Sequence, residues 1–150
     1  GLTRERRSQG SATSCRISAS DWVEDGGLTP EDSVEIARML KAAGCDIVDV
    51  SSGGTAPGAR IDYGRMYQVP FSDRIRHEAG VPTMAVGAIL GWDHANTVIA
   101  AGRADLAVMA RPHLHDPYLA LHAAEAYGHH DQWWPPPYLA AKPRPPRKSP

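Results

Sequence analysis

The chain has 150 residues, 42% of them hydrophobic, so it is long enough to bury a core. Its 16 Lys and Arg residues nearly balance its 17 Asp and Glu residues, and the net charge of -1 gives no general reason to expect nucleic acid or an anionic membrane as a partner. It contains no apolar run of the roughly 18 residues that span a bilayer, and residues 1–7 lack the apolar segment of a secretion signal. The two cysteines, Cys15 and Cys45, lack metal-ligand spacing and the density of a disulfide scaffold. We therefore expect a cytoplasmic protein without a metal.

The two ends of the chain differ in composition from its middle. Residues 1–14 are charged and rich in Ser and Thr, which predicts a disordered lead-in. The tail at 142–150 is basic and rich in Pro, which also predicts disorder or an extended polyproline conformation. Ordered structure is expected over 15–141. The chain begins with Gly1, which is compatible with a fragment, a processed chain or a remnant of cloning.

The first helix signal is followed directly by a strand signal. Thr29 can cap a helix that begins at Pro30, and Gly44 can end it. The β-branched run at 46–50 predicts a buried strand, and the Ser and Gly residues at 51–54 predict a loop after it. This order is typical of α/β proteins.

The same alternation recurs along the rest of the chain. Helices are predicted at 70–79 and 93–101, each followed by a strand, at 82–86 and 105–109. A last helix is predicted at 117–126 with Asp116 as its N-cap. Strands that alternate with helices in this way form parallel βα units, in a doubly wound sheet or in part of a closed barrel.

Two residues after the last predicted strands suggest a phosphate site. In parallel α/β proteins ligands bind at the carboxyl ends of the strands, and barrels often hold a phosphate after the final pair. Gly87 allows the backbone to approach a phosphate closely, and Arg111 offers forked donors with a fixed charge. The alternative is a tight turn at Gly87 and a salt bridge at Arg111.

Several motifs in one order resemble the old yellow enzyme (NADH:flavin oxidoreductase) family, in its thermophilic-like branch. They are RISASDW at 16–22, DVSSGG at 49–54, YQVPF at 67–71, AVG at 85–87 and GRADL at 102–106. A finer resemblance, carried by IAAGRADL at 99–106 and ARPHL at 110–114, is to the flavin-reductase domain of anthraniloyl-CoA and salicyloyl-CoA monooxygenases. The resemblance covers roughly residues 16–142.

The resemblance implies the C-terminal half of a TIM (β/α)8 barrel, its last four βα units. It implies FMN as the cofactor, NADH or NADPH as the reductant, and an activated alkene or an aromatic acyl-CoA product as the substrate. A homo-oligomer or a longer chain is expected to complete the site.

The resemblance also assigns roles to residues at the strand ends. Gly87, Ala110 and Arg111 are expected to hold the FMN phosphate through backbone amides and the guanidinium. Arg16 is expected to face the N1 and C2-carbonyl edge of the flavin, unless it only pairs with Asp49 or Asp21. The backbone is expected to border the flavin at Ser51, Ser52 and Gly53.

No residue of this chain is assigned to catalysis. In the family, the substrate-anchoring histidine pair and the proton-donating tyrosine come from the first half of the barrel, and no position here matches them. One alternative is a catalytically inactive half-barrel that associates with itself or with a complementary half. Another is a phosphate-binding barrel enzyme without flavin, such as an aldolase, although Lys41, Lys142 and Lys148 do not lie at strand ends.

Overall fold

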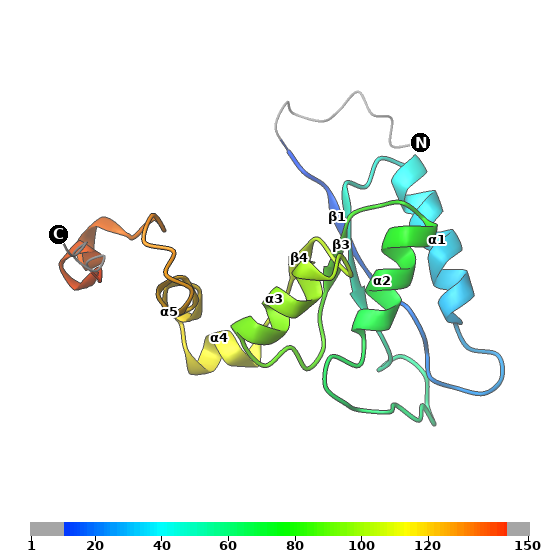
Figure 1. Ribbon diagram of the computed structural model, residues 1–150. Coiled ribbons are helices and arrows are strands. Elements are labelled where there is room, and N and C mark those ends of the chain that lie inside the picture. The colour runs from blue at the N-terminus through cyan, green and yellow to red at the C-terminus, as the bar shows by residue number, and fades with distance from the viewer. Residues whose placement is uncertain (1–10, 144–150) are drawn as a thin grey trace. The chain divides into compact units, whose positions relative to one another are not determined.

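The computed structural model describes residues 11–143. The chain divides into two compact units between Met109 and Ala110. The first unit holds a parallel sheet with its helices, and the second holds helices alone (Figure 1). Among the described residues, no helix has the length and apolar character that a membrane span requires. Disorder was predicted for residues 1–14 and 142–150, and most of these residues, 1–10 and 144–150, lie outside the described part of the chain. Ser14, at the end of the predicted lead-in, lies in a strand.

The first unit is built on a four-stranded parallel sheet whose strands lie in chain order. The strands are β1 (Ser14–Ser18), β2 (Ile47–Ser51), β3 (Thr83–Ala85) and β4 (Leu106–Ala107). The helices between them are α1 (Pro30–Ala42), α2 (Val69–Glu78) and α3 (Trp92–Ala100). The predicted alternation is confirmed, and the fold class is parallel α/β.

Helix α1 begins and ends where its sequence signals lie. The Thr29 hydroxyl accepts a hydrogen bond from the Asp32 N–H at 3.2 Å, and the Asp32 carboxylate accepts one from the Thr29 N–H at 3.0 Å. This capping box satisfies two N–H groups that the helix itself cannot. Pro30 stands in the first turn, and Gly44 follows the helix end with a φ of 96°.

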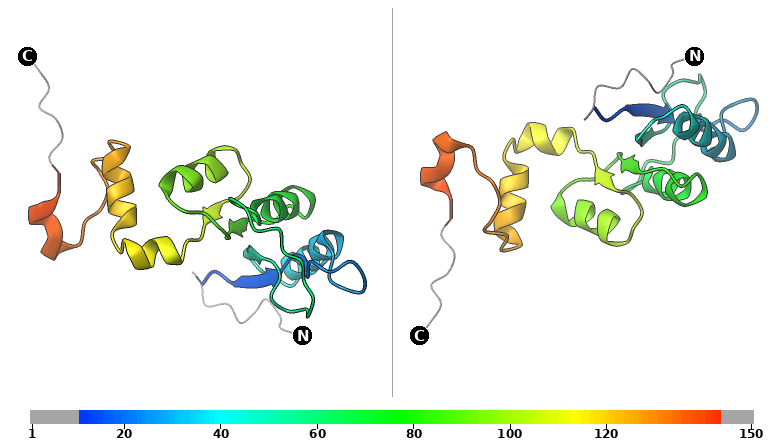
Figure 2. Two further views of the ribbon diagram at one scale, coloured as in Figure 1. Left: turned by 90° about the horizontal axis from the view of Figure 1, so that it is seen from below. Right: turned by 90° about the horizontal axis from the view of Figure 1, so that it is seen from above.

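Helices α1 and α2 lie side by side and cover one face of the sheet (Figure 2). Val48 and Val50 of β2 are fully buried against Val34 and Ala37 of α1 and Ile75 of α2. Burial of each Val or Ile side chain contributes about 1.5–3 kcal/mol. A second cluster joins α2, β3 and α3 through Val69, Ala85, Ile89, Val98 and Ala104.

The opposite face of the sheet carries a row of four residues in register. Arg16, Asp49, Met84 and Leu106 are aligned across β1 to β4, and aligned residues of a parallel sheet point to the same side. Leu106 is 52% exposed and the Arg16 side chain 57% exposed. Within the described residues this face is therefore open at both of its edges.

The second unit contains α4 (Arg111–His115), α5 (Leu119–Ala126) and the 3-10 helix η2 (Pro136–Ala141). The prediction that the last helix begins at Pro117 was wrong by two residues. The Asp116 carboxylate accepts a hydrogen bond from the Tyr118 N–H at 3.0 Å, so it closes a turn ahead of α5 and does not cap the helix. The Tyr118 ring packs edge-on against Tyr138, with ring centroids 5.5 Å apart.

Candidate functional site

The loops that follow β1 and β2 are tied to each other at the carboxyl edge of the sheet. The Gly53 N–H donates to the Ser20 carbonyl at 2.8 Å. The Thr55 hydroxyl and the Leu28 N–H both donate to the Asp21 carboxylate, and these bonds lower the pKa of Asp21. The strand-end residues of β2 are thereby held in one arrangement.

Three residues at this edge hold a strained backbone. Trp22, Met66 and Ala88 have φ values of 56°, 56° and 50°, in the left-handed region that side chains disfavour. They are the only non-glycine residues with positive φ in the described chain, and they lie in the loops after β1, β2 and β3. Such strain costs on the order of 1–3 kcal/mol per residue and gathers at functional sites.

A buried chain of hydrogen bonds connects the same three loops. The Trp22 indole N–H donates to the Ser52 hydroxyl at 2.9 Å, which donates to Gln68 Oε1 at 2.8 Å. Gln68 Nε2 donates to the Val86 carbonyl at 3.1 Å. Gln68 is 3% exposed and Ser52 is 7% exposed, so the bond between them is shielded from water, and the two outer bonds are partly buried.

Gly87 requires glycine for two separate reasons. Its φ of 102° lies in the region that L side chains rarely adopt. A Cβ at this position would also lie 2.3 Å from Gln68 Nε2, far inside contact distance. Among residues 11–143 the Gly87 N–H donates to no other group. The backbone at Gly87 therefore presents an amide that is available to an anion.

Arg16 pairs with Asp49 across β1 and β2. Its Nε and Nη2 lie 2.8 Å and 2.7 Å from Asp49 Oδ2. Asp49 Oδ1 is buried and has no hydrogen-bond partner among the described residues. The ion pair with Asp49, one of the alternatives for Arg16 in the sequence analysis, is therefore present. The Arg16 side chain is still 57% exposed, and its guanidinium has further donors.

Aromatic rings line the outer part of this edge. Trp22 packs edge-on against Phe71 at 5.6 Å and tilted against Tyr67 at 6.3 Å between ring centroids. An open cleft of about 460 Å³ lies beside them, with Arg60 at its rim. It is lined by Trp22, Val23, Glu24, Gly58 and Arg60.

Comparison with known proteins identifies the family. The model of the NADH:flavin oxidoreductase / NADH oxidase family matches residues 4–129. This chain belongs to that family. The resemblance to the old yellow enzymes is confirmed, and membership implies FMN and NADH or NADPH as cofactors.

Curated relatives give the same result. The chain is 50% identical over 113 residues to the NADPH dehydrogenase of Geobacillus thermodenitrificans, an alignment that covers 75% of the chain and 33% of the relative. It is 40% identical over 120 residues to the NADPH dehydrogenase of Listeria innocua, with 75% and 33% covered. The chain therefore spans about a third of the length of the relatives that it matches.

The residues at the carboxyl edge include candidates to hold the FMN that family membership implies. The space that a Cβ of residue 87 would need is already occupied by the Gln68 side chain, and the Gly87 amide has no partner among the described residues. Arg16, Ser51, Ser52 and Gly53 lie at the ends of neighbouring strands of the same unit. Ala110 and Arg111 begin the second unit, and their place beside Gly87 stays a prediction.

Gln68 is the site residue that the sequence analysis did not single out. It appeared there only as part of the motif at 67–71. A glutamine before a proline-containing helix start carries no local signal for burial, and its contacts with Ser52 and Val86 depend on the tertiary structure.

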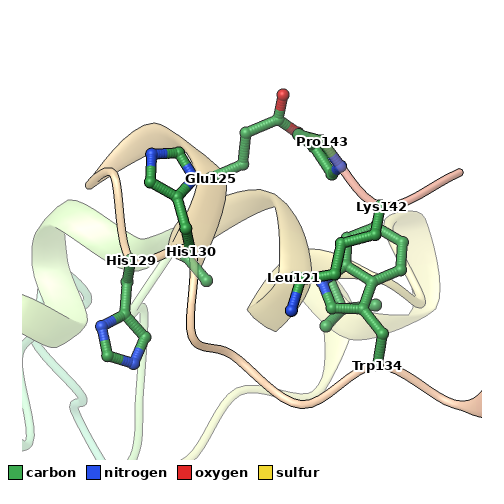
Figure 3. A pocket seen from close by; sticks show the side chains of 8 residues that line it. Leu121, Glu125, His129, His130, Trp134, Lys142 and Pro143 are labelled. Atoms are coloured by element: carbon green, nitrogen blue, oxygen red, sulfur yellow. The ribbon is translucent and has the colours of Figure 1, made fainter. Parts of the chain in front are cut away.

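The second unit has a different group of polar side chains around a small pocket of about 10 Å³ (Figure 3). His129 and His130 line it with Glu125, Trp134 and Lys142. The two imidazoles point in different directions, so they do not converge on one point (Figure 3). Within residues 11–143, no group of three or more His, Cys, Asp and Glu could hold a metal ion.

Proposed function

We propose that this chain supplies the phosphate-binding side of the FMN site in an NAD(P)H-dependent oxidoreductase of the ene-reductase type. The observation that carries the proposal is the backbone at Gly87, at the carboxyl edge of a parallel sheet. Gly87 has a left-handed φ, and its amide has no partner among the described residues. Family membership supports the identity of the ligand.

Three residues are assigned to the phosphate. The amides of Gly87 and Ala110 donate to phosphate oxygens, and the Arg111 guanidinium adds forked charged donors. Arg111 lies three residues beyond Val108, and the Val108 N–H donates to the Ala85 carbonyl of β3 at 2.8 Å. The order along the chain is therefore suited to bringing the two strand ends to one phosphate.

Arg16 is assigned to the flavin ring. Bound FMN supplies an electron carrier between the nicotinamide and the substrate. The Arg16 guanidinium is fixed by Asp49 and keeps donors for the N1 and C2-carbonyl edge, where it stabilises negative charge. The strand-end backbone of β2 borders the ring at Ser51, Ser52 and Gly53.

The direct test is titration of the purified chain with FMN, followed by flavin fluorescence and the visible spectrum. We expect saturable quenching, and we expect Arg111→Gln to weaken binding by about tenfold or more, because hydrogen bonds to charged groups are worth about 1.5–3 kcal/mol. Arg38→Gln, which removes an exposed arginine of α1, serves as the matched control. Absence of a saturable change in the wild-type chain would overturn the proposal.

We further propose that the four βα units form the C-terminal half of a TIM barrel, and that the complete enzyme reduces an activated alkene or an aromatic acyl-CoA product. The parallel sheet in chain order and the motifs at 99–106 and 110–114 support these two points. Reduction of a panel of enones and acyl-CoA dienones by the complete enzyme, with NADH and NADPH compared, is the test.

A second function is favoured by the exposed sheet face. The row of Arg16, Asp49, Met84 and Leu106 points to the side that is interior in a closed barrel, and Leu106 is 52% exposed. A catalytically inactive half-barrel that associates with itself or with a complementary half would cover this row. Sedimentation of the chain as a monomer that does not bind FMN would contradict both functions.

A further inference from the structure

Gln68 is hydrogen-bonded to the peptide unit that carries the proposed phosphate-binding amide. The Val86 carbonyl and the Gly87 N–H belong to one planar trans peptide unit, so they point in opposite directions. The Gln68 Nε2 bond to the Val86 carbonyl, 3.1 Å long, therefore fixes the direction of the Gly87 N–H. It also polarises the peptide, which strengthens that N–H as a donor.

The orientation of the Gln68 amide is determined by its partners. The Val86 carbonyl can only accept, so it must face Nε2. The Ser52 hydroxyl then donates to Oε1 at 2.8 Å, and the Trp22 indole donates to the same hydroxyl at 2.9 Å. The donor and the acceptor of each bond in this chain are therefore fixed, and together the bonds hold the Gln68 amide in one orientation.

A second hydrogen bond joins the same two loops. The Met66 N–H donates to the Ala88 carbonyl at 3.3 Å, next to the Gln68 bond to Val86. Both Met66 and Ala88 have strained positive φ values. The segment 66–68 thus holds the segment 86–88 at two points, on either side of Gly87, and keeps it in a conformation of high local energy.

We propose that Gln68 is a positioning residue for the FMN phosphate, acting through the Val86–Gly87 peptide and touching no part of the flavin itself. This inference rests on the proposed FMN site at Gly87. A merely structural glutamine would stabilise the chain without favouring a phosphate, so the two roles differ in a measurable way. Only a positioning role predicts an effect on FMN that is absent for riboflavin, which lacks the phosphate.

The test compares FMN and riboflavin affinities by fluorescence titration in the wild-type chain and in Gln68→Met, an uncharged side chain of similar length without a donor. We expect the wild-type chain to prefer FMN by at least about tenfold, and the variant to lose most of that preference while its riboflavin affinity changes by less than about twofold. Gln68→Asn, which keeps an amide too short to reach the Val86 carbonyl, provides the same test if Gln68→Met does not fold.

Ser72→Ala is the matched control. Ser72 is a fully buried residue of α2 whose hydroxyl donates to the Val69 carbonyl at 2.9 Å, so its loss perturbs the same helix without touching Val86. We expect it to keep the FMN preference. An unchanged preference in both Gln68 variants would overturn the role of Gln68 alone. A wild-type chain that binds FMN no more tightly than riboflavin would overturn the phosphate site itself, and the role of Gln68 with it.

Discussion

At the scale of single residues, one property of Gly87 could be predicted from the sequence and two could not. Its place after an apolar run indicated a close approach to a ligand. The structure adds the positive φ and the contact with Gln68, which no local pattern could supply because the two residues are 19 positions apart and meet only in the fold. Arg16 is similar: its strand position was predictable, and its pairing with Asp49 followed from the parallel register.

Gly87→Ala tests the two constraints on this position. We expect a loss of about 1–3 kcal/mol in the free energy of unfolding, because the new Cβ meets Gln68 and the left-handed φ is strained. Urea unfolding followed by circular dichroism measures it. Gly64→Ala is the control, since Gly64 has no neighbour within 4 Å of its Cβ position and no left-handed φ. Equal stability of the two variants would refute the constraint.

At the scale of elements, α1, α2 and α3 were predictable because each carries its own start or stop signal. The capping box of Thr29 and the glycines after α1, α2 and α3 are local features. The start of α5 was missed because Asp116 can cap a helix or close a turn, and contacts outside the helix decide between them. Asp116 here is engaged twice, by the Tyr118 N–H and by His122, and the bond from His122 lowers the pKa of Asp116.

An ion pair at the amino edge of the sheet joins α2 to the start of β4. The Arg76 guanidinium donates to both carboxylate oxygens of Asp105 at 3.1 Å, and Asp105 also accepts from the Thr83 N–H at 2.9 Å. The bonds from Arg76 lower the pKa of Asp105. A carboxyl group with a lowered folded-state pKa stabilises the fold fully above its ordinary value of 3.8, and that contribution is lost as the pH falls through the lowered value.

We therefore expect the stability of the wild-type chain to fall as the pH is lowered below about 4, and Asp105→Asn to flatten part of that fall. At pH 7 the variant should be less stable by about 1–2 kcal/mol, because the bonds to a charged carboxylate are replaced by weaker ones and the side chains are partly exposed. Urea unfolding at several pH values measures both. A variant with the wild-type pH profile would show that this carboxylate contributes nothing to acid unfolding.

At the scale of the whole molecule, the sequence predicted a parallel α/β chain and its family. It did not predict how the two compact units are arranged. Family motifs lie on strands and loops that local signals also mark, so the two kinds of reasoning agreed over residues 16–106. Ala110 begins a separate compact unit, and local sequence signals do not encode how two units are arranged. The roles of Ala110 and Arg111 are for that reason proposals.

The exposed row of the sheet predicts association of the isolated chain. Met84 is half-buried and Leu106 is exposed on the face opposite α1 and α2, and exposed apolar side chains on a sheet favour a partner. We expect the wild-type chain to sediment above its monomer mass of 16.2 kDa, and Leu106→Lys to shift it toward the monomer. The control for the added charge alone is Met39→Lys, which replaces an exposed methionine of α1. A wild-type monomer at high concentration would contradict the association.

The most direct measurement of the phosphate site is a titration of the 15N-labelled chain with FMN, observed through its backbone amide resonances. We expect the Gly87, Ala110 and Arg111 amides to shift together and to saturate at one concentration, and riboflavin to leave these three unshifted. Shifts that spare Gly87 and Arg111 while other amides respond to FMN would contradict the phosphate cradle.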